Sequence, residues 1–109
     1  MIQAVIIKDR LGEYKEIRIE GHAGYAEYGQ DIVCAAVSVL AQNAVNSIET
    51  FTDDLFQAEV NEESGALAVR FFDSVSENTN LLLDSMVLGL KSIEESYGRQ
   101  YIKIRFEEV

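Results

Sequence analysis

Residues 31–48 read DIVCAAVSVLAQNAVNSI, and this stretch decides how the chain is organised. Asp31 can accept a backbone N–H bond from the turn that follows it, so we expect it to be the N-cap of a long helix. The apolar residues of that helix recur at three- and four-residue spacing: Val33, Val37, Leu40, Ala44 and Ile48. Polar residues interrupt the stretch, which therefore predicts a core helix and no membrane span.

Outward from this helix, Ile2–Lys8 is apolar on both faces, which predicts a central strand. Tyr14–Glu20 alternates between apolar and charged residues, so we expect it to complete a hairpin with the first strand. The same periodicities predict the remaining elements in chain order: strands at 56–60 and 67–71, a helix over Ser76–Tyr97 closed by a left-handed cap at Gly98, and a strand at 101–107.

The predicted order is ββαββαβ, which indicates an α+β fold with two helices packed on a mostly antiparallel five-stranded sheet. The chain has 109 residues and no proline, and nothing in its composition marks a linker. We therefore expect a single domain over residues 1–109.

Charge and cysteine content narrow the classes of function. Nine Lys and Arg against 19 Asp and Glu give a net charge of −10, which argues against direct nucleic acid binding and favours a basic protein partner. Acidity that serves only solubility is an equally good reading. One cysteine cannot form an internal disulfide, and the N-terminus has no signal-peptide pattern, so we expect a cytoplasmic protein.

The chemistry of the chain rests on its one histidine and its one cysteine. Cys34 lies within the first turn of the predicted helix, where unpaired N–H groups favour a thiolate. His22 follows a strand at the start of a glycine-bearing loop, where it could take the proton of the thiol as a general base. Asp31 could orient His22, although the N-cap is the simpler role.

Non-catalytic readings of the same residues stay open. A lone cysteine before an apolar helix is most often a small buried hydrophobe, and a lone histidine beside glycine is usually a turn residue. One His and one Cys are too few ligands for a structural zinc site, so we expect no metal and no cofactor.

Two motifs resemble a known family: Gly21-His22-Ala23 and Gly29-Gln-Asp-Ile-Val-Cys-Ala-Ala-Val-Ser38. They are similar to the ribosomal-processing cysteine proteases called Prp, and the resemblance extends over nearly the whole chain. It implies a homodimeric cysteine endopeptidase that removes the N-terminal extension of bacterial large-subunit ribosomal protein twenty-seven, cutting after an aromatic pair and before a small residue. His22 and Cys34 match the catalytic histidine and cysteine of the family.

The segment from 21 to 30 is then the predicted substrate loop. Its assigned residues are Gly21, Gly24, Tyr25, Tyr28 and Gly29. We expect this loop to be mobile without substrate, and its two tyrosines to form an apolar wall for aromatic substrate residues. The distance between His22 and Cys34 can therefore be long in the free protein.

The alternative function is a non-catalytic acidic module that holds a basic ribosomal protein during ribosome assembly. A thiol-based redox sensor is weaker, because the chain has no second cysteine to resolve an oxidised sulfur. Alkylation separates the classes, since a catalytic thiol reacts faster than a free thiol near neutral pH.

Overall fold

The element order predicted from the sequence is confirmed. A computed structural model of the chain describes residues 1–27, 29–61 and 63–109. The elements are β1 (Ile2–Lys8), β2 (Tyr14–Glu20), α1 (Ile32–Phe51), β3 (Phe56–Val60), β4 (Leu67–Phe71), α2 (Glu77–Tyr97) and β5 (Ile102–Glu108).

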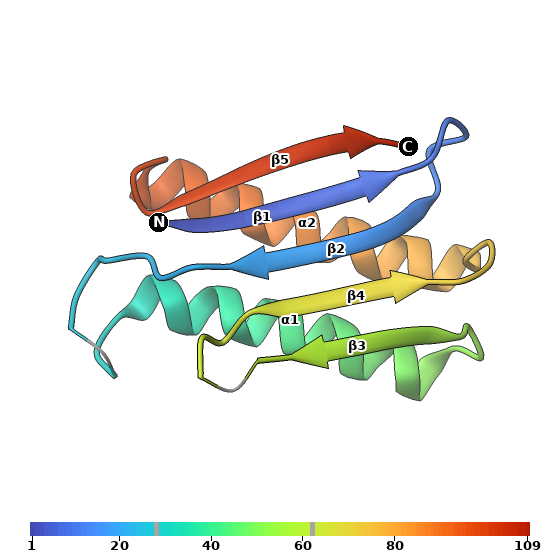
Figure 1. Cartoon of the computed structure of the whole chain (residues 1–109), viewed down its shortest axis with the longest axis horizontal. Helices are drawn as coiled ribbons and strands as arrows, with labels where there is room; N and C mark the ends of the chain where they lie inside the picture. The colour runs from blue at the N-terminus through green and yellow to red at the C-terminus, as the bar shows by residue number, and fades with distance from the viewer. Residues whose placement is uncertain (28, 62) are drawn as a thin grey trace.

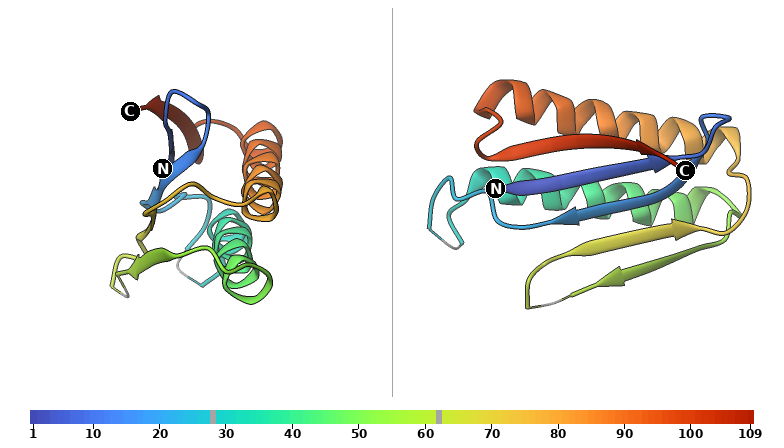
Figure 2. Two further views of the ribbon diagram at one scale, coloured as in Figure 1. Left: turned by 90° about the vertical axis from the view of Figure 1, so that its right-hand side faces the viewer. Right: turned by 45° about the horizontal axis from the view of Figure 1, so that its top comes forward.

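The strands form one sheet in the order β3-β4-β2-β1-β5, and both helices cover the same face of it (Figures 1 and 2). The β1–β5 pair is parallel and the three other pairs are antiparallel, as expected for a mostly antiparallel α+β fold. β1 pairs with β2 on one side and with β5 on the other, which confirms its predicted central position. Its Val5 is buried and lies between Arg18 and Arg105 in the register of the sheet.

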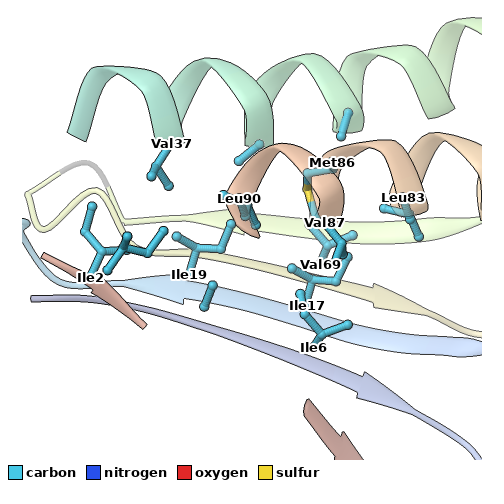
Figure 3. Packing of buried hydrophobic residues seen from close by; sticks show 14 of the residues in the cluster. Ile2, Ile6, Ile17, Ile19, Val37, Val69, Leu83, Met86, Val87 and Leu90 are labelled. Carbon is cyan, nitrogen blue, oxygen red and sulfur yellow. The ribbon is translucent and has the colours of Figure 1, made fainter. Parts of the chain in front are cut away.

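Helix α1 packs on the sheet through Val33, Val37, Ala41, Ala44 and Ile48. Ala41 takes the place predicted for Leu40, which instead packs beside Gly89 of α2, where a Cβ atom would lie 2.8 Å from it. The core continues through the side chains that Figure 3 shows between the helices and the strands. By length and composition α1 could cross a membrane, a test that core helices also pass.

Helix α2 is preceded by the N-cap Ser76, whose hydroxyl accepts a bond from the Thr79 N–H, and is followed by the C-cap Gly98. The φ and ψ angles of Gly98 are 109° and 156°, so the predicted left-handed helical cap is wrong in detail. Only glycine readily adopts this combination of φ and ψ. At Gly98 the backbone leaves the helix and turns toward β5. The turn between α2 and β5 lies at the same end of the molecule as residues 21–27 (Figure 1).

Candidate active site

Asp31 joins the start of α1 to the preceding loop. Its Oδ1 accepts bonds from the backbone N–H groups of Val33 and Cys34, both at 3.0 Å, which confirms the predicted N-cap. Its Oδ2 accepts from Tyr25 at 3.0 Å and Ala26 at 3.4 Å. Partial burial acts to raise the pKa of Asp31, but the N–H bonds from Cys34, Tyr25 and Ala26 outweigh it and hold that pKa below its usual value.

The thiol of Cys34 is half-buried and has a backbone donor of its own. The N–H of Ala23 points at Sγ across 3.3 Å, and the Ala23 methyl group is buried in the core. A hydrogen bond to the charged form of a group favours that form. The loop before α1 thus supplies one donor that can stabilise a Cys34 thiolate.

His22 lies on the exposed side of the same loop, two residues after β2 ends. Gly21 turns the chain toward it with φ of +95°, and a Cβ there would lie 2.4 Å from the carbonyl oxygen of Met1. Within the described residues, no hydrogen bond joins the His22 ring to Cys34 or to Asp31. The structure thus shows Asp31 as a cap and a loop anchor, without the His22 contact that orienting would require.

His22 and Cys34 nevertheless line one cavity of about 610 Å³. Its apolar part is built from core residues at this end of the sheet, including Ile2, Ile19 and Val37 (Figure 3). Its acidic part comprises Glu20, Asp31 and Glu63. An apolar cavity with a few polar groups and a thiol is a typical small-ligand or peptide site.

The predicted substrate loop is only partly in this cavity. Gly21, Gly24 and Gly29 line it, whereas Tyr28 lies outside the described residues. Tyr25 does not line it in this structure, and its role as an apolar wall for substrate stays a prediction. Its ring instead packs edge-on against Tyr97 and Tyr101, with centroids 5.4 and 5.1 Å apart.

Sequence reasoning missed two contributions to the cavity. Ser38 lies four residues after Cys34, and helical spacing could have placed it on the same face. The turn between β3 and β4 contributes Glu63, Ser64 and Gly65, and no local signal could have brought residues so distant in sequence to Cys34. In the described ranges, no three His, Cys, Asp or Glu side chains gather to hold a metal ion.

These contacts allow nucleophilic chemistry. A thiol at a helix start, with a further N–H donor at the sulfur, can be held as a thiolate. The exposed imidazole of His22 lines the same cavity, and catalytic contacts often tighten only with substrate bound. The acidic and apolar lining would then select the molecule that reacts.

Comparison with known proteins gives a consistent picture. The family described as cysteine protease Prp matches residues 1–103. The ribosomal processing cysteine protease Prp of Staphylococcus aureus is 32% identical over 98 residues, which cover 90% of this chain and 92% of the relative. Its Bacillus subtilis counterpart is 31% identical over 101 residues, covering 89% and 90%.

A solved structure agrees with both relatives. It is the crystal structure of an essential ribosomal processing protease Prp from S. aureus in complex with a covalently linked product peptide. This chain resembles it with a TM-score of 0.93 and 30% identity, over 98% of this chain and 100% of the other. The chain therefore belongs to the Prp family of cysteine proteases.

Proposed function

We propose that this protein removes the N-terminal extension of bacterial large-subunit ribosomal protein twenty-seven in the cytoplasm, with Cys34 as nucleophile and His22 as general base. One observation carries the proposal: the single cysteine and the single histidine of a Prp-family chain line the same cavity at the start of α1.

The reaction follows from these two side chains. His22 takes the Cys34 proton, and Sγ attacks the scissile carbonyl carbon to form a tetrahedral adduct. The adduct collapses to a thioester as the C–N bond breaks, and the imidazolium gives its proton to the leaving amine. Water then loses a proton to His22, attacks the thioester and releases the acid, while the sulfur regains its proton.

The lining of the cavity supports a peptide of this kind. Ile2, Ile19 and Val37 offer apolar surface to the aromatic pair that precedes the cut. Glu20 and Glu63, which form no ion pair within the described ranges, favour a basic ribosomal protein. β3 is an edge strand that ends beside the cavity, so an extended substrate could pair with it.

Mass spectrometry of the precursor incubated with purified protein tests the proposal, because it reports cleavage and bond position together. We expect one cut after the aromatic pair, and none after the thiol is alkylated. An intact precursor that co-purifies with the protein at equal stoichiometry would instead identify an acidic binding module.

We also propose a homodimer. On α2, Leu81 and Leu88 are each 67% exposed and lie two helical turns apart, so they offer two apolar contacts on one face for a second copy. Light scattering is expected to give twice the mass of the 12.2 kDa chain. A monomer at micromolar concentration contradicts the dimer and leaves the cleavage proposal intact.

A further inference from the structure

A cluster of three tyrosines lies behind the loop that holds His22. Tyr25 comes from the loop, Tyr97 from the last turn of α2, and Tyr101 from the turn before β5. The ring of Tyr25 meets those of Tyr97 and Tyr101 nearly edge-on, at interplanar angles of 89° and 73°. Edge-on packing at these centroid distances of 5.4 and 5.1 Å is the attractive geometry for aromatic pairs.

The backbone around Tyr25 connects this cluster to the thiol. The Tyr25 N–H donates to Asp31 Oδ2 at 3.0 Å, and two residues earlier the Ala23 N–H donates to Cys34 Sγ at 3.3 Å. Gly24, between them, has φ of +70° and open space around its Cα, so nothing at that residue itself holds the loop in place. The Tyr25 ring is thus a side-chain anchor next to the sulfur donor, in addition to the buried methyl group of Ala23.

We infer that Tyr25, Tyr97 and Tyr101 are positioning residues that keep the Ala23 N–H directed at Cys34 Sγ and so stabilise the thiolate. None of the three touches the thiol or lines its cavity, and their effect passes through the loop backbone. The inference rests on the proposed function, because it assumes that Cys34 reacts as a thiolate.

Other charged groups line the same cavity as the sulfur and must be kept constant. The loop contributes His22, the helix start Asp31, the end of β2 Glu20, and the β3–β4 turn Glu63. The three carboxylates oppose a thiolate and His22 favours it when protonated. Replacing a tyrosine leaves all four of these charged residues in the sequence. A change in the alkylation rate of Cys34 would therefore indicate a change in the position of the loop.

The experiment is alkylation of the protein by iodoacetamide between pH 5 and pH 10, followed by intact mass. Cys34 is the one cysteine of the chain, so a single adduct is read directly. For Tyr97→Leu, which removes one aromatic contact, we expect a roughly 5-fold slower reaction near neutral pH and a profile shifted to higher pH. Tyr25→Leu removes two such contacts and should slow the reaction further. Tyr25→Phe and Tyr97→Phe keep the edge-on ring and should match wild type.

Phe56→Leu is the matched control, since it removes a ring from the Phe56–Phe71 pair, which does not line the cavity of Cys34. Its pH profile should be that of wild type. If Tyr25→Leu and Tyr97→Leu, folded by circular dichroism, keep the wild-type midpoint and rate, the positioning role is overturned. Because Tyr25 is 42% exposed, its replacement should spare the fold.

The alkylation experiment tests the positioning role separately from the proposed cleavage of the ribosomal precursor. Wild-type protein that shows a reactive thiol but leaves the ribosomal precursor intact contradicts the substrate, and the tyrosine variants still decide the positioning role. Conversely, unchanged profiles in the tyrosine variants remove the positioning role while precursor cleavage stands.

Discussion

Two aspartates, Asp31 and Asp54, stabilise the starts of the two long helices in similar ways, yet only Asp31 lies next to the candidate active site. Asp31 caps α1 directly. Asp54 reaches α2 through its cap, accepting the Ser76 N–H at 2.9 Å and the Ser76 hydroxyl at 2.7 Å on Oδ2. Hydroxyl bonds from Thr79 and then Ser76 hold the pKa of Asp54 below its usual value, as N–H bonds do at Asp31.

Their surroundings differ. Around Asp54, the chain closes over Thr79, which is fully buried. Around Asp31, a glycine-bearing loop leaves a cavity of about 610 Å³ open beside the thiol. At both helix starts the carboxylate stabilises the first turn of the helix. A candidate active site results only at Asp31, where the neighbouring loop leaves room for a ligand.

The largest effect is expected from the two reacting side chains. Cys34→Ala should abolish precursor cleavage, and His22→Ala should reduce it at least ~100-fold, the usual contribution of a general base. Timed mass spectra of the cleavage reaction measure both. Circular dichroism should show native folds, and full cleavage by folded Cys34→Ala would remove the nucleophile assignment.

The next largest effect is expected on stability, from the glycines of the loop beside Asp31. The segments around Asp54 contain no glycine, so this effect is specific to the first region. Gly21→Ala places a Cβ 2.4 Å from the Met1 carbonyl oxygen and should destabilise the fold by about 2–5 kcal/mol. Gly24→Ala meets no atom within 4 Å and should cost about 1 kcal/mol. Urea unfolding of the two variants tests this, and equal losses would show that the contact with Met1 relaxes.

Replacing each aspartate by alanine tests the comparison itself. Asp31→Ala removes the N-cap of α1 and Asp54→Ala removes the acceptor of the Ser76 cap of α2, so each should lower the free energy of unfolding by at least about 1 kcal/mol. Cleavage should fall about tenfold in Asp31→Ala alone, because only that residue holds the loop with charge-assisted bonds of about 1.5–3 kcal/mol. An equal loss of cleavage in Asp54→Ala would show that activity follows stability.

The smallest effect is the acid dependence of folding. In the folded protein the pKa values of Asp31 and Asp54 lie below the ordinary value of 3.8, so each ionised carboxylate adds to the free energy of unfolding above that pH. That stability is lost as the pH falls through the lowered folded values. The free energy of unfolding should therefore decrease below about pH 4, and Asp31→Asn and Asp54→Asn should each show a shallower decrease. Identical slopes in wild type and variants would contradict the lowered values.

Much of the fold could be predicted because its signals are local. Alternation in Tyr14–Glu20 and helical spacing after Asp31 depend on side chains a few residues apart, and the structure has both elements at these positions. The exchange of Leu40 for Ala41 in the buried stripe was not predictable, because it depends on Gly89 in the other helix.

The candidate site likewise has features that depend on local sequence and features that depend on tertiary contacts. The sequence by itself determined the N-cap at Asp31 and the elements that carry His22 and Cys34, since each depends on neighbours within a few residues. Only the tertiary structure decided that the β3–β4 turn borders the thiol and that Tyr25 packs on Tyr97 and Tyr101. Those contacts join residues 29 to 76 positions apart, and they form only when sheet order and helix packing bring one end of each element together.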